Sequence, residues 1–293
     1  MAVGCLSAPN RPAFTGMADF RGPIYHTGEW PHEGVDFTGL RVGVIGTGSS
    51  AIQSIPIIAQ QASELTVFQR TANWAAPLHN GKIDAETQAR IKAGYGEIFA
   101  RCKETFACFV HTPDPRGAFE VSDEEREAFY EKLYGERGFG IWQGNFKDIL
   151  IDRAANATIS DFVARKIRER VKNQAVAEKL IPKNHGFGTR RLPLETFYYE
   201  VYNRDNVELV DIKETPIERI TPEGIRTTEK DYAFDIIIYA TGFHSQEFQG
   251  DLPVIGRGGV DLRERWGNAP EAYLGMTVDG FPNFFMLYGP NTN

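Results

Sequence analysis

The pattern of apolar and polar positions is clearest between residues 40 and 75. Residues 42–45 form the apolar run VGVI, which is typical of a strand buried on both faces of a parallel sheet. Apolar residues then recur at helical spacing from Ala51 to Ala59, and a second apolar run, LTVF, occupies 65–68. The pattern therefore predicts a strand, a glycine-containing loop, a helix and a second strand.

A long segment, about 82–180, has a helical pattern instead. Ser122 and Glu125 have the spacing of a capping box ahead of the sequence EEREAFYEKLYGE. Ser160 precedes another apolar stripe, so we expect it to be the N-cap of a helix that ends at Pro182. Strand-like runs return later, in NVELV, PIERI and FDIIIYATGF. The whole pattern predicts an α/β core that is interrupted by a helical insertion.

Composition and charge exclude several classes of protein. The chain has 293 residues, of which 42% are hydrophobic and 24% are charged, as in an ordinary globular enzyme. A net charge of −7 argues against nucleic-acid binding, which requires a basic face. No apolar run approaches the roughly 20 residues that span a bilayer. We therefore expect neither a nucleic acid nor a membrane as a partner.

The cysteines indicate a reducing environment. Cys5, Cys102 and Cys108 form an odd, scattered set without the pattern of a disulfide framework, which is typical of the cytoplasm. The spacing of Cys102, Cys108 and His111 matches no common zinc site. We therefore expect a cytoplasmic protein without a bound metal.

The glycine-containing loop has the form G-x-G-x-x-A, from Gly46 to Ala51, between a predicted strand and a predicted helix. In that context Gly46 permits a tight turn, and Gly48 lets the backbone approach a pyrophosphate. Ala51 allows the helix to pack closely on the strand, and the helix N-terminus adds N–H groups with a partial positive charge. The loop predicts a dinucleotide site. The alternative is a strand–helix turn that binds no ligand.

The end of the second strand predicts which dinucleotide is bound. A site for NAD carries a carboxylate there, which binds the ribose 2′-hydroxyl. This strand ends instead in Gln69, Arg70 and Thr71. An arginine at this position makes charge-assisted, bidentate hydrogen bonds to a 2′-phosphate. The sequence therefore predicts NADP(H).

The segment before this loop, FRGPIYHTGEWP, resembles the signature F-x-G-x-x-x-H-x-x-x-W-P of Baeyer–Villiger monooxygenases, which are class B flavoprotein monooxygenases. Taken alone, His26 in this segment is interpreted as a packed, hydrogen-bonded side chain. Further segments that resemble the family are VGCLSAPNRPAFTG, FQRTANW, FGTRRLPL, YATGF and FPNFFMLYGPN. The resemblance spans nearly the whole chain, and the helical insertion is its least distinctive part.

The resemblance implies a flavoprotein with two dinucleotide-binding domains, represented here by a Rossmann-like NADP-binding domain and part of an FAD-binding domain. Residues 1–34 would be the exit of the FAD domain and a linker, 35–230 the NADP domain, and 231–293 a returning segment of the FAD domain. The G-x-G-x-x-G loop with which such enzymes bind FAD is missing from the sequence. We therefore expect a fragment, truncated at both ends, of a longer enzyme.

The implied reaction uses NADPH, FAD and O₂ to insert one oxygen atom into a ketone or aldehyde, giving an ester or lactone. Arg191 matches the family's catalytic arginine, whose fixed charge stabilises an anion without protonating it. Arg190 matches a neighbouring basic residue, usually lysine, that helps to hold the 2′-phosphate. Without the resemblance, the two are interpreted as an exposed basic pair. His26 is expected at the domain junction, where it would couple domain closure to turnover.

The same resemblance assigns further residues to the cofactors. The backbone at Ala240–Gly242, after a buried strand, is expected to approach the flavin, although a plain strand-end turn is the alternative. The side chains expected near the NADP phosphates or the nicotinamide ribose, beside Gly46, Gly48, Arg70 and Thr71, are those of Thr47, Ser49, Ser50 and Gln53.

Two other functions remain open at this point. Related flavin-containing monooxygenases hydroxylate nitrogen or sulfur, but their signature typically lacks the Trp30-Pro31 pair, so this pair favours Baeyer–Villiger chemistry. The other alternative is a truncated NADP-binding module whose flavin site cannot form.

Overall fold

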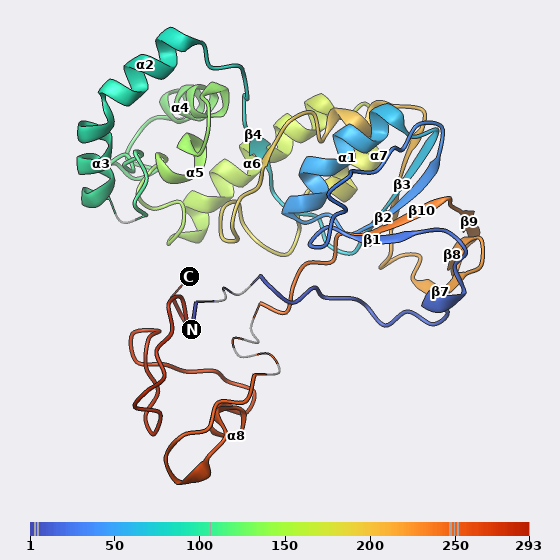
Figure 1. Cartoon of the computed structure of the whole chain (residues 1–293). Helices are drawn as coiled ribbons and strands as arrows, with labels where there is room; N and C mark the ends of the chain where they lie inside the picture. Colours follow the sequence, from blue (N-terminus) through green and yellow to red (C-terminus); the bar gives the residue numbers. More distant parts are fainter. Residues whose placement is uncertain are drawn as a thin grey trace.

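The computed structural model describes all residues except 3, 5, 106, 246, 247, 249, 251 and 293, so Cys5 lies outside the described residues. Its centre is a five-stranded sheet in which all neighbouring strands are parallel (Figure 1). Helix α1 (Ser49–Gln61) connects two of these strands, which confirms the predicted strand, loop, helix and strand. In order across the sheet, the strands are β1 (Ile24–His26), β10 (Ile236–Tyr239), β2 (Arg41–Ile45), β3 (Glu64–Gln69) and β6 (Val207–Asp211).

The parallel sheet is covered on both faces. On one face, Val42 and Val44 of β2 belong to the same hydrophobic core as Ile52 and Ile55 of α1. On the other face, Ile45 belongs to a second core, which the parallel sheet shares with a three-stranded antiparallel sheet. Burial on both faces explains why the sequences of the central strands β2 and β10 are almost continuously apolar instead of alternating. The antiparallel sheet consists of β7 (Ile217–Thr221), β8 (Gly224–Thr227) and β9 (Asp231–Ala233).

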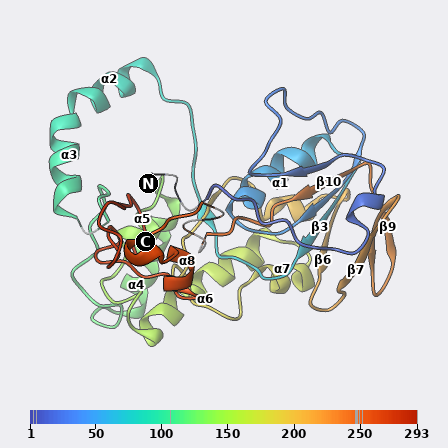
Figure 2. The same ribbon diagram turned by 60° about the horizontal axis from the view of Figure 1, so that its bottom comes forward.

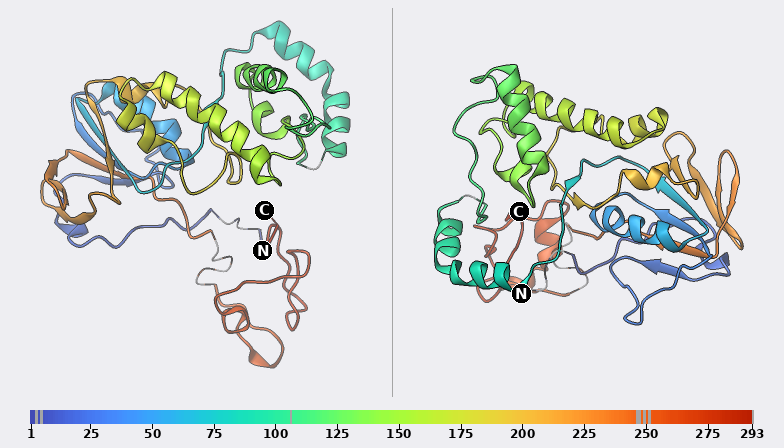
Figure 3. Two further views of the ribbon diagram at one scale, coloured as in Figure 1. Left: turned by 180° about the vertical axis from the view of Figure 1, so that it is seen from behind. Right: turned by 90° about the horizontal axis from the view of Figure 1, so that it is seen from above.

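The helical insertion lies beside the sheet (Figures 1 and 3). It contains α2 (Ala85–Ala93), α3 (Tyr95–Glu104), α4 (Asp123–Gly135), α5 (Gly140–Gln143), α6 (Arg153–Arg170) and α7 (Gln174–Leu180). Helices α2 and α3 form its outer edge (Figure 2), and no residue of either helix is buried. Ser122 caps α4 as predicted, because its hydroxyl accepts a hydrogen bond from the N–H of Glu125 at 3.2 Å. The carboxylate of Glu125 does not complete a capping box but binds Arg116.

Ser160 is not an N-cap, contrary to the prediction. Helix α6 begins seven residues earlier, at Arg153, and its N-cap is Asp152, whose carboxylate accepts a hydrogen bond from the N–H of Ala155 at 2.8 Å. Ser160 therefore lies inside the helix, where its hydroxyl donates to the side chain of Asn156 one turn earlier. Serine is favoured at N-caps, but inside a helix its hydroxyl can bind a group one turn earlier, so the serine and the apolar stripe together do not locate the first turn. Helix α6 also ends before Pro182, at Arg170, and α7 intervenes.

The parallel sheet combines strands from all three of the predicted segments 1–34, 35–230 and 231–293. The run Ile236–Tyr239 was expected in the returning segment of a second domain, but β10 lies between β1 and β2 in the sheet of the glycine loop. Strand β1 likewise belongs to this sheet, although it precedes the boundary expected at residue 34. Parallel pairing between strands so distant in sequence leaves no local signal. The domain boundaries themselves stay predictions.

The shorter elements are β4 (Ala76–Pro77), which pairs with β5 (Leu194–Glu195), the 3₁₀ helices η1 (Met17–Asp19), η2 (Glu200–Asn203) and η3 (Arg257–Gly259), and α8 (Leu262–Trp266). Around α8, the end of the described chain forms a small separate core that includes Phe281 and Met286. The first residue of the chain lies beside this core, since the N–H of Leu287 donates to the carbonyl oxygen of Met1 at 2.9 Å (Figure 1). No helix in the described part of the chain is both long and apolar enough to cross a membrane.

Candidate functional site

A cavity of about 490 Å³ lies at the carboxyl ends of β2, β3 and β10. Its walls include Gly46–Gly48 after β2, Arg70 and Thr71 after β3, Ala240–Gly242 after β10, and Arg190. Ligands of open α/β sheets bind at this edge, and the volume is within the range of small-molecule sites. The fold therefore brings together the two halves of the predicted site, the glycine loop and the arginine that follows the second strand.

Glycine is present at positions 46 and 48 of the loop for different physical reasons. Gly46 has φ +112°, and a Cβ atom there would lie 2.4 Å from the carbonyl oxygen of Ala240, so the fold itself requires glycine. Gly48 has φ −81° and ψ −173°, which any residue adopts, and a Cβ atom there would have no atom within 4 Å. The space in front of Gly48 is therefore open to a ligand.

The side chains of the loop and of α1 divide into two groups. Thr47 is 5% exposed, and its hydroxyl donates to the carbonyl oxygen of Thr71 at 3.0 Å, which ties the loop to the segment after β3. Ser49, Ser50 and Gln53 lie in the first turns of α1 rather than in the cavity wall, and Gln53 Nε2 donates to the carbonyl oxygen of Leu194 at 3.4 Å. Their cofactor roles stay predictions.

The helix N-terminus supplies donors that do not depend on these side chains. The N–H of Ile52 donates to the carbonyl oxygen of Gly48 at 2.9 Å and closes the first turn of α1. The N–H groups of Ser49, Ser50 and Ala51 precede that bond, so they have no acceptor one turn earlier in the helix. Backbone donors of this kind, with the partial charge of the helix, suit an anion such as a pyrophosphate.

Of the three arginines that were predicted to act at this site, Arg70 and Arg190 line the cavity and Arg191 does not. Arg70 and Arg190 are exposed side chains in the cavity wall, and neither forms an ion pair with an acidic residue in the described part of the chain. Arg191 is exposed as well but is not part of that wall. The structure therefore brings Arg190, and not Arg191, to the glycine loop.

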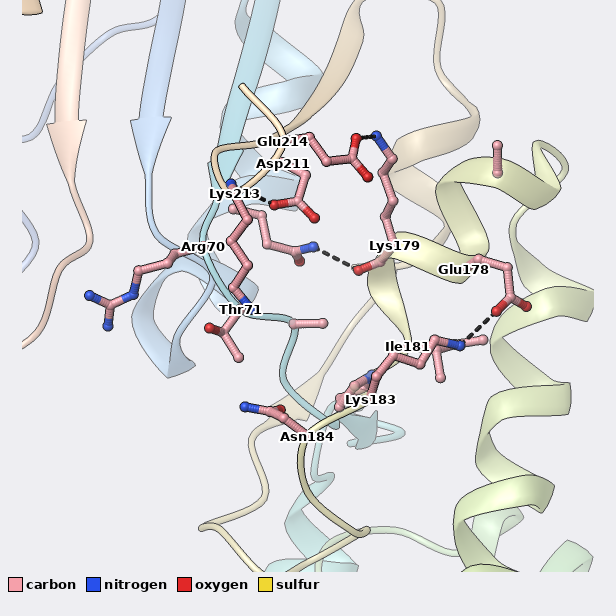
Figure 4. A pocket seen from close by; sticks show the side chains of 14 residues that line it. Arg70, Thr71, Glu178, Lys179, Ile181, Lys183, Asn184, Asp211, Lys213 and Glu214 are labelled. Atoms are coloured by element: carbon pink, nitrogen blue, oxygen red, sulfur yellow. Dashed lines mark hydrogen bonds and ion pairs between the residues drawn. The ribbon is translucent and has the colours of Figure 1, made fainter. Parts of the chain in front are cut away.

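A second cavity, of about 380 Å³, shares Arg70 and Thr71 with the first (Figure 4). Two of its three lysines are neutralised: Lys179 Nζ lies 2.6 Å from Glu214 Oε2, and Lys183 Nζ lies 2.6 Å from Glu178 Oε2. Arg70 points away from both ion pairs (Figure 4). The positive charges that remain available to an anion in the described part of this wall are therefore those of Arg70, at the junction of the two cavities, and of the exposed Lys213.

His26 lies outside the cavity wall, in the last position of β1. It is 3% exposed, its Nδ1 accepts a hydrogen bond from the N–H of Gly28 at 3.0 Å, and its ring contacts that of Phe243 edge to face. Burial lowers the pKa of His26, so the imidazole is neutral at pH 7. These contacts fit a packed side chain, and its catalytic role stays a prediction.

The residues expected near the flavin border the same cavity as the nucleotide loop. Gly242 has φ +79°, and the Thr241 hydroxyl donates to the carbonyl oxygen of Asn10. The N–H of Asn10 donates in return to the carbonyl oxygen of Gly242 at 2.8 Å. Asn10 was not expected at the site, because the proline-rich segment around it has no periodicity that predicts a position.

Among the described residues, no group of three His, Cys, Asp or Glu side chains is close enough to hold a metal ion.

The chain is similar to known monooxygenases over nearly its whole length, although no protein-family model matches its sequence. It is 48% identical to 2-oxo-Δ³-4,5,5-trimethylcyclopentenylacetyl-CoA monooxygenase of Pseudomonas putida, over 99% of this chain and 54% of that protein. It is 44% identical to a Baeyer–Villiger monooxygenase of Pseudooceanicola batsensis, over 99% of this chain and 53% of that protein.

The fold gives the same result. A crystal structure of OTEMO in complex with FAD and NADP matches with a TM-score of 0.96 and 48% identity, over 98% of this chain and 55% of that one. The chain thus spans about half the length of the relatives that it matches. Sequence and fold together confirm the resemblance carried by FRGPIYHTGEWP and the segments after it: the chain belongs to the Baeyer–Villiger monooxygenase family.

Proposed function

We propose that this chain is the coenzyme-binding part of an NADPH- and FAD-dependent enzyme that inserts one oxygen atom of O₂ into a ketone or aldehyde. The product would be an ester or lactone. The observation that carries the proposal is the identity of 48% over 99% of the chain with a curated monooxygenase, together with the cavity that the glycine loop and Arg70 share.

The residues of the cavity fit NADP. The open space before Gly48 and the N–H groups of the first turn of α1 suit the pyrophosphate. Arg70 and Arg190 offer two guanidinium groups to the 2′-phosphate, and strand β3 is followed by Arg70 where an NAD site has a carboxylate. We therefore infer a preference for NADP(H) over NAD(H).

In the proposed enzyme, NADPH would supply a hydride to the flavin, and FAD would supply the chemistry that activates O₂, from which the inserted oxygen atom comes. Arg191, on the same loop as Arg190, is proposed to stabilise negative charge in the reaction, because a guanidinium does so without giving up its proton. Ala240–Gly242 is proposed to let the backbone approach the flavin, since Gly242 leaves open space where a Cβ atom would be. His26, whose ring contacts that of Phe243, is proposed to couple domain closure to turnover.

The coenzyme preference tests the proposal directly. NADP⁺ and NAD⁺ are titrated into the 293-residue chain by calorimetry, and the same titration is made with Arg70→Gln. We expect NADP⁺ to bind at least about tenfold more tightly, since one hydrogen bond to a charged group is worth roughly 1.5–3 kcal/mol. Arg70→Gln should weaken NADP⁺ and leave NAD⁺ unchanged. Equal affinity of the unaltered chain for the two coenzymes would refute the proposal.

One observation favours a second candidate function, oxygenation of nitrogen. A relative named phenazine N-monooxygenase, from Lysobacter antibioticus, is 37% identical over 99% of this chain. A cyclic ketone and an aromatic amine, offered side by side with NADPH and FAD, separate the two functions by product. If the purified chain binds NADPH but shows no flavin absorbance after incubation with FAD, it is a coenzyme-binding module without oxygenase activity of its own.

A further inference from the structure

The loop that carries both arginines is held by side chains of the helical insertion and by Trp74, whose Nε1 donates to the carbonyl oxygen of His185 at 3.0 Å. We call residues 185–191 the arginine loop; it contains neither helix nor strand. Trp142 Nε1, from α5, donates to the carbonyl oxygen of Gly188 at 3.0 Å. Asn156 and Ser160, from α6, bind the backbone of Phe187. The conformation of the loop at Phe187 and Gly188 therefore depends on hydrogen bonds from side chains of the insertion.

Asn156 and Ser160 satisfy both polar groups of the Phe187 backbone. Asn156 Nδ2 donates to the carbonyl oxygen of Phe187 at 2.8 Å, and the N–H of Phe187 donates to Ser160 Oγ at 3.0 Å. The hydroxyl of Ser160 donates in turn to Asn156 Oδ1 at 3.0 Å. The three residues thus form a closed ring of hydrogen bonds, which fixes the backbone at Phe187 in two directions.

The amide of Asn156 has no freedom to turn. The side chain is 8% exposed, and Nδ2 donates its second hydrogen to the carbonyl oxygen of Ile149 at 2.7 Å. The loop passes in direct contact with it, since a Cβ atom on Gly186 would lie 1.9 Å from Asn156 Oδ1. A buried amide that uses both hydrogens and its oxygen is a rigid support, because any rotation leaves a buried polar group unsatisfied.

Arg190 follows Phe187 by three residues and reaches the wall of the cavity. No acidic side chain in the described part of the chain holds its guanidinium, so its place depends on the backbone of the loop. To bind a phosphate through two hydrogen bonds, the guanidinium must lie within hydrogen-bond distance of the phosphate oxygens and in one plane with them. A small shift of the loop would therefore break this pair of hydrogen bonds.

We infer that Asn156 and Ser160 are positioning residues that hold Arg190 at the coenzyme cavity through Phe187 and thereby set the preference for the phosphorylated coenzyme. The inference rests on the proposed NADP site. It gives the helical insertion, the part of the chain least distinctive in sequence, a role in coenzyme selection.

The test is the ratio of NADP⁺ to NAD⁺ affinity in the full chain with Asn156→Asp. This substitution keeps the size of the side chain but places a carboxylate oxygen against the carbonyl oxygens of Ile149 and Phe187. We expect NADP⁺ to bind about tenfold more weakly, the loss of one charge-assisted hydrogen bond, while NAD⁺ changes by less than about twofold. In an Arg190→Ala background, Asn156→Asp should leave the ratio unchanged, because its effect passes through Arg190.

Asn145 provides a matched control. It is 1% exposed, lies in the same insertion, donates to the carbonyl oxygen of Ile141 at 2.9 Å and accepts from the N–H of Phe146 at 2.8 Å. Asn145→Asp should lower the thermal midpoint without changing the ratio of affinities. If Asn156→Asp acts only as Asn145→Asp does, the inference is wrong.

Two further results decide the remaining cases. If Asn156→Asp does not fold, Ser160→Ala, which removes one hydroxyl, takes its place: a lower ratio supports the inference and an unchanged ratio overturns it. If the unaltered chain binds both coenzymes equally, the proposed NADP preference fails and the inference fails with it. If the unaltered chain prefers NADP⁺ and both Asn156→Asp and Ser160→Ala keep that preference, the positioning role is refuted while the proposed NADP site stands.

Discussion

Exchange of each loop glycine for alanine separates what the fold needs from what the ligand needs. Gly48 has a backbone conformation open to any residue and free space where a Cβ atom would lie. Gly48→Ala should therefore change the free energy of unfolding by less than about 1 kcal/mol. The gain from a less flexible unfolded chain, about 0.4–1 kcal/mol, opposes the loss of a favourable N-cap residue.

Gly46→Ala should behave in the opposite way. At φ +112° a side chain is strained by about 1–2 kcal/mol. The new Cβ atom would also lie 2.4 Å from the carbonyl oxygen of Ala240, and overpacking of this kind typically costs about 1–3 kcal/mol. We expect a total of roughly 2–5 kcal/mol, because the backbone at the end of β2 or of β10 has to move.

Urea unfolding and coenzyme titration of the two variants complete the test. Gly48→Ala should fold normally and bind NADP⁺ at least about tenfold more weakly, because its methyl group occupies the space through which a pyrophosphate reaches the first N–H groups of α1. Normal folding with unchanged affinity would refute the view that this loop holds the phosphates. A Gly46→Ala variant as stable as the unaltered chain would show that the contact with Ala240 is not limiting.

Two further predictions concern stability. Arg170 Nη2 lies 2.8 Å from Oε1 of Glu195, whose side chain is 1% exposed, so Arg170→Met should lower the free energy of unfolding in urea by about 3–5 kcal/mol. Arg168→Met removes an exposed ion pair with Glu178 and should lower it by less than about 1 kcal/mol; equal losses would contradict the reasoning. Burial lowers the pKa of His26, so the unfolded chain binds the proton more tightly and stability should fall as the pH drops below about 6.5. His26→Gln should make that decline shallower; burial also lowers the pKa of His111 and His185, so part of it remains, and an unchanged slope would exclude His26 as a cause.

Sequence reasoning succeeded where structure is set by neighbours in the chain. The run from Val42 to Phe68 contains its own signals of strand, turn and helix, and the structure has each of them. The N-cap of α4 was predicted for the same reason, because Ser122 and the N–H that it binds are three residues apart.

Prediction failed where the partner is distant. The N-cap of α6 was misplaced because Ser160 serves a loop 27 residues away, and no local pattern distinguishes that use from a cap. The buried Arg170–Glu195 pair joins α6 to β5 and has no signature in the sequence. The order of β1, β10 and β2 in the sheet also depends on pairing between strands that are far apart in the sequence. The position of Ala240–Gly242 beside the glycine loop therefore became known only from the structure.

The central position of β10 has a consequence for biosynthesis. Strands β1 and β2 are made early but are not neighbours in the sheet, and the strand that fills the gap between them is translated roughly 190 residues later. At ribosomal rates this is a delay on the order of 10–40 s, during which two strand edges stay open to wrong partners. Ala240–Gly242 emerges later still, so the coenzyme cavity gains its last wall only after the whole helical insertion has left the ribosome.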